Sequence, residues 1–408
     1  MNNPLKHLRH VGPGLVIAAT GLGAGDLIAA SVAGAKFGTT ILWAAVLGAI
    51  MKYAMNEGLT RWQLATGTTL LEGWVQRLPK FISIYFFIYL LAWSFIVAGA
   101  LIAGTGLAAH ALFPQLSVEQ WGIFHSLLAL VLVLVGRYTL LEHLMKIFMA
   151  LMLLVVIICA ILVAPGVSDI LRGLLIPSIP DGSVLFILGV IGGVGGSVTL
   201  LCYGYWIRER DWNQPKDMPR SRIDLAVAYI LTGLFGVAIM IISAGVHPDI
   251  MTGPGMALAV ASQLEEVAGP FGKWCFLVGF WCAVFSSMLG VWQGIPYLFA
   301  DFVQQYTWQP EKPTSVNTRS TAYRGYLAYL ALPPMLLLLA GKPVWLVMIY
   351  AVAGAFFMPL LCVLLLLLNN RRMLLGDLKN GLLTNLVLLG SLLLFGLLLY
   401  TEIAKYLG

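Results

Sequence analysis

Charged side chains are scarce in this chain. Asp, Glu, Lys and Arg make up 10% of the 408 residues, whereas hydrophobic residues make up 60% and the mean hydropathy is +0.90. These values lie outside the range of soluble globular proteins and indicate a polytopic membrane protein. The basic N-terminus is followed by a long apolar run without a small-residue cleavage pattern, so we expect the first segment to stay in the mature protein.

Motifs for disulfide frameworks, metal centres and catalysis are also missing. The five cysteines show no CxxC spacing, and the chain has no P-loop, nucleophile elbow or pair of metal-binding histidines. It also has no soluble region large enough for an ATPase domain. We therefore expect no enzyme and no cofactor, and any active transport should be secondary.

Long apolar runs fill most of the chain. A helix needs roughly 20 apolar residues to cross the hydrocarbon core of a bilayer. Runs of this kind predict an all-α integral membrane protein with about eleven transmembrane helices. They fall near 13–35, 40–63, 81–111, 119–137, 143–164, 183–207, 222–246, 270–302, 323–341, 344–368 and 381–403.

Positive charge marks alternate connections between these runs. Cytoplasmic loops of membrane proteins are enriched in lysine and arginine. The pattern predicts a cytoplasmic N-terminus and an extracytoplasmic C-terminus in the inner cell membrane, with lipids as partners. It also accounts for the net charge of +6 without nucleic-acid binding. The basic connections are the N-terminus, 61–80, 137–146, 207–222, 303–324 and 369–380, whereas 112–119, 164–182 and 247–269 carry few or no positive residues.

Eleven spans would give the first five helices and the next five opposite orientations. Inverted repeats of this kind are typical of secondary transporters. We expect the repeats at 1–165 and 180–368, followed by an extra helix at 381–404, within one transmembrane domain. If the repeats are equivalent, a feature of the first helix should recur in the sixth.

Glycine clusters interrupt both the first and the sixth helix. Thr20–Asp26 combines three glycines with a carboxylate, although glycine weakens helices and a buried charge is costly. A second cluster occupies 192–197. Broken helices at membrane depth line solute pathways, so we predict a substrate site there. Close helix packing is the alternative explanation. The predicted break residues are Gly21, Gly25, Gly195, Gly196 and Gly204.

Several sequence blocks carry a family resemblance that runs through nearly the whole chain. The most specific one extends from Met358-Pro359 through Asn369-Asn370-Arg371-Arg372 to Asn380. Together the blocks resemble the natural-resistance-associated macrophage protein (Nramp) family of divalent-metal transporters. The resemblance implies a LeuT-type fold with helices 1 and 6 broken, and alternating access to a metal site between them. The other blocks lie at 33–38, 41–43, 61–67 and 285–294.

The family's metal-site motifs are changed. The usual metal-binding Asp of helix 1 falls on Gly23, and the usual Asn falls on Asp26. The Met-Pro-His of helix 6 falls on Leu200–Cys202, and the pore-facing Gln of helix 10 falls on Ala351. The thioether that favours transition metals is therefore absent. Residues 81–113 contain no Asp or Glu, so we expect the family's proton-coupling route to be missing.

The remaining chemistry at the breaks suits a cation. Asp26 is the sole carboxylate there, and unwinding should free backbone carbonyls near Leu22, Gly23 and Leu200. The Cys202 thiol and the Tyr203 hydroxyl complete the predicted substrate-binding set, with Asp26 as the candidate metal ligand. Hard ions such as Mg²⁺ or Mn²⁺ can keep several waters when protein ligands are few. We predict a poorly selective carrier of divalent ions.

Other interpretations of the same residues stay open. An amine or amino acid would also fit one carboxylate, freed carbonyls and aromatic rings, and Gly23 in place of a carboxylate would leave room for it. Asp26 could instead be a structural charge paired with Lys52, or cap the second half of the helix. Cys202 could be a small packing residue.

Overall fold

The computed structural model describes residues 12–136, 138–193, 195–244, 255–306, 316–340, 353–354 and 356–407. The side chains at 24–26, 28, 255–258, 340, 398–399 and 401–407 lie outside this description. Within the described ranges all regular elements are helical, which confirms the predicted all-α class. Ala351 falls outside these ranges.

The helices follow the order of the predicted spans, with short helices in some of the connections. The α-helices are α2 Pro13–Gly21, α3 Ala24–Phe37, α4 Leu42–Thr66, α5 Leu70–Arg77, α6 Lys80–Leu112, α7 Val118–Val135, α8 Tyr138–Leu162, α9 Val167–Leu175, α10 Val184–Gly193, α11 Tyr203–Arg208, α12 Met218–Ser243, α13 Gly255–Tyr306, α14 Thr321–Ala331, α16 Phe357–Asn369, α17 Arg372–Leu375 and α18 Leu382–Leu407. The 3₁₀ turns are η1 Val198–Cys202, η2 Pro215–Asp217, η4 Pro333–Ala340 and η5 Gly376–Leu378.

Seven stretches of the described residues are long and apolar enough to cross a membrane, and the bent pair of α16 with α17 would add an eighth. The seven are α6, α7, α8, α10 with η1 and α11, η2 with α12, α13 from Ala259, and α14 with η4. The predicted number of eleven stays a prediction. The first predicted span is divided between two shorter helices, and α4 carries the polar residues Lys52, Asn56 and Glu57. The tenth predicted span is described only in part.

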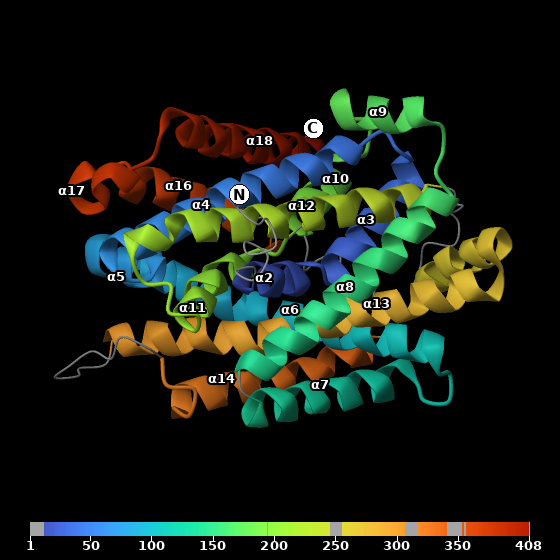
Figure 1. Cartoon of the computed structure of the whole chain (residues 1–408), viewed down its shortest axis with the longest axis horizontal. Helices are drawn as coiled ribbons and strands as arrows, with labels where there is room; N and C mark the ends of the chain where they lie inside the picture. Colours follow the sequence, from blue (N-terminus) through green and yellow to red (C-terminus); the bar gives the residue numbers. More distant parts are fainter. Residues whose placement is uncertain are drawn as a thin grey trace, which may run out of the picture.

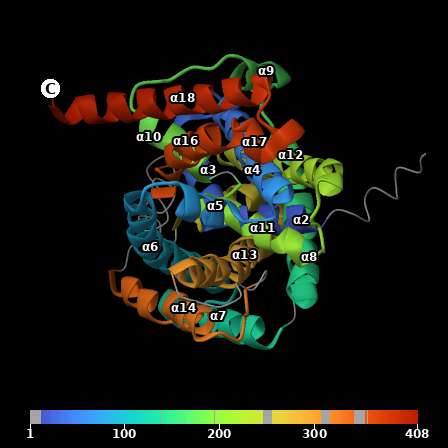
Figure 2. The ribbon, with the colours of Figure 1, turned by 90° about the vertical axis from the view of Figure 1, so that its left-hand side faces the viewer.

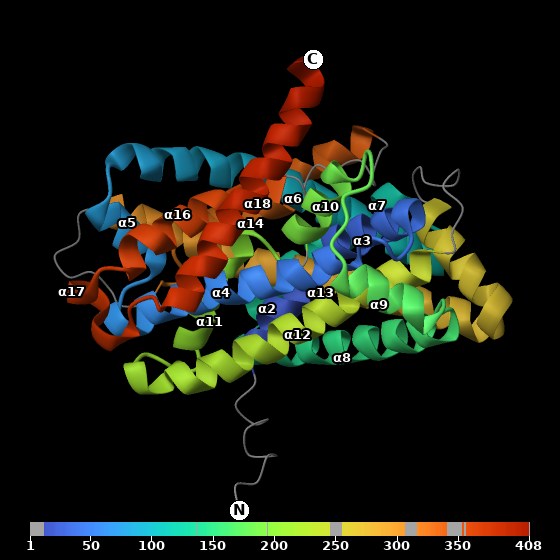
Figure 3. The same ribbon diagram turned by 90° about the horizontal axis from the view of Figure 1, so that it is seen from above.

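The interrupted helices lie at the centre of the bundle (Figure 1). α12 packs against α2, α3 and α4, while α13 packs against α2, α6 and α8. Seen from the side, α16 and α18 lie on one flank and α7 and α14 on the opposite flank (Figure 2). The C-terminal end of α18 extends beyond its neighbours (Figure 3). Residues of α2, α3, α10 and η1 are therefore surrounded by protein.

Burial follows the pattern of a membrane protein. The centre holds large, fully buried aromatic residues such as Trp62, Trp206 and Trp292. The outer faces of α7 and α8 expose aliphatic side chains, including Val135 at 81% and Ile161 at 71%. Such surfaces are unfavourable in water and favourable in lipid, because a bilayer core is as apolar as these side chains.

α13 consists of two helical segments that meet at Gly269, where φ is +69°, ψ is −170° and Pro270 follows. These angles do not continue an α-helix, and glycine adopts them at little cost. The second segment begins close to the predicted start at 270, whereas the first segment, from Gly255, lies in a stretch that we expected to be a connection. The span predicted at 323–341 changes to a 3₁₀ turn at Pro333, since two consecutive prolines remove backbone donors.

Candidate functional site at the two helix breaks

The first predicted break is present but narrower than expected. α2 ends at Gly21 and α3 begins at Ala24, so the interruption consists of Leu22 and Gly23. Their ψ angles of 55° and −158° do not continue an α-helix. Gly25 lies inside α3, and its prediction as a break residue is wrong. The helix resumes directly after the break, where the Leu27 amide donates to the Gly23 carbonyl at 3.1 Å.

The second predicted break lies between α10 and η1. Gly195 and Gly196 have φ angles of +76° and +82°, a region that side chains rarely occupy. The Gly196 amide donates to the carbonyl of Gly193 at 3.0 Å, which turns the chain sharply. Both glycines thus lie between α10 and η1 in conformations that do not continue the helix.

Gly204 has a different role from the one predicted. It lies inside α11, where a Cβ would come within 2.2 Å of Gln63 Oε1. Gln63 Nε2 donates to the Gly204 carbonyl at 2.6 Å. The absence of a side chain therefore allows α4 to approach α11, and Gly204 is a packing residue.

The two breaks touch through their backbones. A Cβ on Gly21 would lie 2.5 Å from the carbonyl carbon of Gly195 and 2.7 Å from the nitrogen of Gly196. Atoms this close leave no room for any side chain. Glycine at these three positions therefore serves both close packing and the interruption of the helices, and the two explanations offered for the clusters are compatible.

α13 supports the first break. The Ser287 hydroxyl donates to the Thr20 carbonyl at 2.6 Å, which satisfies an acceptor at the end of α2. A Cβ on Gly23 would lie 2.1 Å from the same hydroxyl oxygen. A Cβ on Gly290 would lie 2.0 Å from Thr20 Oγ1, so Gly290 packs directly against the Thr20 side chain. Part of the 285–294 block that resembles the Nramp family thus packs directly on the break.

Lys52 supports the second break. Lys52 is only 1% exposed. Its ammonium group donates a hydrogen bond to the carbonyl of Gly192 at 2.9 Å. This carbonyl lies in the last turn of α10, where the helix offers unpaired acceptors and the negative end of its dipole. The buried cation is therefore compensated by the interrupted helix. The predicted alternative of a pair with Asp26 falls on a side chain outside the described ones.

Two hydroxyl groups beside the second break remain available. Ser197 Oγ and Thr199 Oγ1 are buried and have no hydrogen-bond partner among the described residues. Unpaired buried oxygens are costly, and oxygen atoms are the preferred ligands of hard cations. The described side chains contain no cluster of three or more His, Cys, Asp or Glu that could hold a metal.

The predicted ligands are distributed around the two breaks. Asp26 is the third residue of α3, directly after the first break, but its side chain lies outside the described ones. Leu22 and Leu200 are fully buried. The carbonyls of Gly23 and Leu200 are not free as expected, because they accept the amides of Leu27 and Tyr203. Each keeps one lone pair.

Cys202 and Tyr203 have structural contacts. A Cβ on Gly294 would lie 2.9 Å from the Cys202 sulfur, so the thiol packs closely on α13. The Tyr203 hydroxyl donates to Asp224 Oδ2 at 2.8 Å. Both predicted ligand roles stay predictions, while the structure assigns these side chains to helix packing.

Asp224 of α12 fixes the beginning of α2. Its carboxylate accepts the amides of Gly12 at 3.0 Å and Gly14 at 2.6 Å, in addition to the Tyr203 hydroxyl. A carboxylate at a helix N-terminus is favourable for the orphan amides and for the helix dipole. The contact holds the start of α2 against α12 and the first residue of α11.

A second ionic contact reinforces the same end. Glu142 of α8 pairs with Arg210 and, at 2.7 Å, with Lys146. The hydrogen bond from Arg210 to Glu142 raises the pKa of the guanidinium, so Arg210 stays protonated. A Cβ on Gly12 would lie 3.1 Å from Arg210 Nη2, so this pair lies next to the start of α2.

Comparison with known proteins agrees with the fold and the resemblance. The sequence profile described as natural resistance-associated macrophage protein-like matches residues 14–404. The chain belongs to this family. The divalent metal cation transporter MntH of Chromohalobacter salexigens is 24% identical to this Nramp protein over 305 residues, which are 68% of each chain.

Solved structures share the architecture of this Nramp protein. A mutant of the manganese transporter of Eremococcus coleocola superposes with a TM-score of 0.78 at 15% identity, over 99% of this chain and 88% of that chain. The transporter MhsT in complex with L-phenylalanine gives 0.60 at 16% identity over 95% and 97% of the two chains. These matches confirm the predicted LeuT-type fold. The Nramp protein is thus a multi-pass membrane transporter and not an enzyme.

Sequence reasoning missed the residues that support the breaks. Ser287, Ser197 and Thr199 were not predicted as site residues, although Ser287 lies in the 285–294 block, Ser197 ends the second glycine cluster and Thr199 follows it. Their position next to glycine was the available signal. Asp224 gave none, because its partners are more than 200 residues away in the chain or on another helix.

Proposed function

We propose that this chain carries a divalent metal ion across the membrane by alternating access around the two helix breaks. The observation that carries the proposal is the backbone contact of Gly21 with Gly195 and Gly196, which brings both interrupted helices to one point. Family membership and the name of the MntH relative support a metal as substrate. In transporters of this kind the substrate binds where two broken helices meet.

The ion should be hard and only weakly selected. Asp26 supplies the one carboxylate directly after the first break, and Ser197 and Thr199 supply hydroxyl oxygens beside the second. Oxygen ligands suit Mg²⁺ and Mn²⁺, whereas thioether and thiolate ligands suit softer ions. Cys202 packs on α13, so we do not include it among the ligands.

Transport should proceed without the proton route of the family. α6 lacks carboxylates along its whole length from Lys80 to Leu112. Proton relays in membranes are built from chains of titratable side chains, and the only histidine of this helix, His110, lies in its last turn, so α6 offers no such chain. We infer movement of the ion down its own gradient.

The organic-solute alternative has lost one of its supports. It required the space left by glycine in place of a carboxylate at position 23, but the Ser287 hydroxyl fills that space, 2.1 Å from the expected Cβ position. The alternative still rests on the single carboxylate, the aromatic rings and the shared fold, and the experiment below decides it.

The arrangement in the membrane follows from the loop charges. We propose a cytoplasmic N-terminus, an extracytoplasmic C-terminus and a location in the inner cell membrane. The inverted repeats would then be 1–165 and 180–368, with 381–404 as an extra helix. In this orientation the Asp224 contact lies at the cytoplasmic end of α2.

Uptake into liposomes tests the proposal. Purified protein should show saturable uptake of Mn²⁺ or Mg²⁺, and Asp26→Ala should abolish it. Asp169→Ala is the matched control, because it removes an exposed carboxylate on α9 and should leave uptake unchanged. Equal uptake by wild type and Asp26→Ala would contradict a metal site at Asp26.

Two further measurements separate the alternatives. In a thermal-shift screen, divalent ions should raise the apparent melting temperature, whereas a shift by amino acids or amines alone would establish the organic-solute alternative. The signal of a pH-sensitive dye inside the liposomes should stay constant during uptake. Acidification that follows the metal flux would show that protons are coupled by another route.

A further inference from the structure

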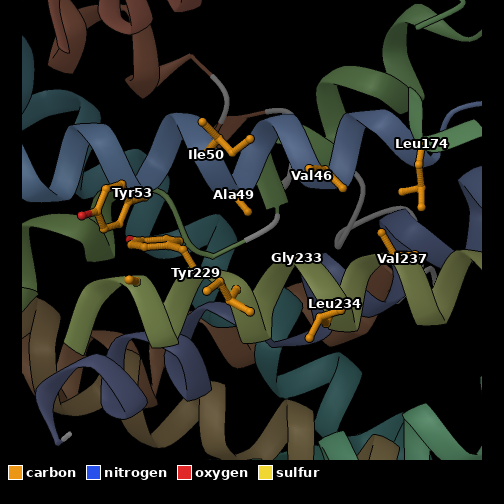
Figure 4. Close-up of a pocket in the computed structure, with 11 residues that line it drawn as sticks. Val46, Ala49, Ile50, Tyr53, Leu174, Tyr229, Gly233, Leu234 and Val237 are labelled. Carbon is orange, nitrogen blue, oxygen red and sulfur yellow. The ribbon is translucent and has the colours of Figure 1, made fainter. Parts of the chain in front are cut away.

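An apolar groove lies between the outer faces of α4 and α12, which pack against each other. It has a volume of about 460 Å³. Leu174 and Val237 lie at one end, and Tyr53 and Tyr229 lie at the other (Figure 4). The groove is distinct from the two helix breaks, and nothing in the proposed transport function requires it.

The dimensions of the groove suit a hydrocarbon chain. Its walls include Ile50, Ile230 and Leu234, which are 51%, 61% and 49% exposed. Along α12 it extends from Ala226 to Val237, which are 11 residues apart, or about 16 Å at 1.5 Å per residue. This is roughly half of the ~30 Å hydrocarbon core of a bilayer, the depth reached by the acyl chains of one leaflet.

A positive charge lies at the tyrosine end of the groove. Arg222 precedes Ala226 by one turn of α12, and Glu57 follows Tyr53 by one turn of α4. Arg222 Nε donates to Glu57 Oε1 at 3.0 Å, while Arg61 Nε donates to Glu57 Oε2 at 2.7 Å. One carboxylate thus faces two guanidinium groups, which leaves a net charge of about +1 by formal count.

The excess charge is accessible only through Arg222. Its side chain is 50% exposed, whereas that of Arg61 is 3% exposed and hydrogen-bonded to Asn380 Oδ1. A guanidinium group can bind phosphate oxygens in a bidentate manner. An exposed arginine at the end of an acyl-sized groove therefore matches a molecule with an anionic head and an apolar tail.

We propose that this groove binds an anionic phospholipid, with one acyl chain between α4 and α12 and the phosphate at Arg222. In the proposed orientation the lipid belongs to the cytoplasmic leaflet. Its chain would contact the Tyr229 ring, whose hydroxyl accepts a hydrogen bond from Asn56 Nδ2 at 3.0 Å. On its other side the same ring packs against the second break, since a Cβ on Gly195 would lie 2.8 Å from Tyr229 Cε1.

Lipid retention tests the site. The full-length protein is purified in a mild detergent from a membrane that contains both phosphatidylglycerol and phosphatidylcholine. The lipids that remain bound to the protein are then extracted and quantified by mass spectrometry. Leu234→Trp fills the groove without adding charge, and Arg222→Gln removes the head-group contact. The matched controls are Leu154→Trp, at a leucine of α8 that is 59% exposed, and Arg220→Gln, at an arginine whose side chain is 53% exposed.

The proposal predicts that wild type and both controls retain phosphatidylglycerol in preference to phosphatidylcholine. Leu234→Trp and Arg222→Gln should retain at least about tenfold less, because a hydrogen bond to a charged group is lost or the chain is displaced. Equal retention in all five proteins would overturn the site. Loss in Leu234→Trp alone, with no preference between the two lipids, would show a neutral acyl site and contradict the anionic assignment.

A second measurement needs no variant that must fold. Phosphatidylglycerol added to delipidated wild-type protein should raise its apparent melting temperature more than the same concentration of phosphatidylcholine. An equal effect of both lipids would contradict the role of Arg222.

Discussion

Substituting Gly21 by alanine tests the contact between the two breaks. The added Cβ would lie 2.5 Å from Gly195 C, 2.7 Å from Gly196 N and 2.8 Å from Gly195 Cα. All three are backbone atoms and cannot rotate away. Ordinary van der Waals contact begins near 3.4 Å, so the breaks must separate by about 1 Å. Overpacking of this size costs about 1–3 kcal/mol.

Both stability and transport should respond. We expect Gly21→Ala to lower the apparent melting temperature in detergent and to reduce divalent-ion uptake in liposomes severely, because the proposed substrate site lies at the contact. Gly325→Ala is the control, since a Cβ at that helical position meets nothing within 4 Å and alanine favours helices. Wild-type melting temperature and uptake in Gly21→Ala would refute the contact.

Three further substitutions address the supports of the site. Asp224→Asn should destabilise the start of α2 by about 1 kcal/mol or more, because it weakens charged hydrogen bonds to two amides. Hydrogen exchange of the first α2 amides should therefore increase, and unchanged exchange would contradict the role of Asp224 at this helix start. Gly23→Asp should reduce the yield of folded protein in gel filtration, and adding Ser287→Gly should restore it; equal yields would show that the space is free. Lys52→Met should cost about 1–3 kcal/mol in stability, measured by thermal unfolding, because the carbonyl at the end of α10 loses its donor, and no change would mean that water replaces it.

The interruption of the first and sixth helices could be predicted because its cause is local. Glycine weakens a helix wherever it stands, and two clusters at equivalent places in the chain indicated a shared feature. The limits of each break could not be predicted in the same way. Gly25 and Gly204 lie in helices, where the surrounding backbone hydrogen bonds outweigh their low propensity.

The supports of the breaks depend on contacts between distant parts of the chain. Ser287 reaches the Thr20 carbonyl across 267 positions, and Lys52 reaches Gly192 across 140. Composition and periodicity do not specify such pairs, because many serines and lysines would fit a general pattern equally well. The family resemblance placed the 285–294 block near the centre, but it did not indicate which atoms meet.

The most direct test of the central claim is the position of the ion itself. A crystal or cryo-electron microscopy structure of the protein with Mn²⁺ should show the metal between residues 22–26 and 197–200, with ligand oxygen atoms at about 2.0–2.6 Å from the ion. Anomalous scattering from the crystals identifies the manganese, and the peak should disappear in Asp26→Asn. A peak elsewhere, or one that persists in Asp26→Asn, would contradict a metal site formed by the two broken helices.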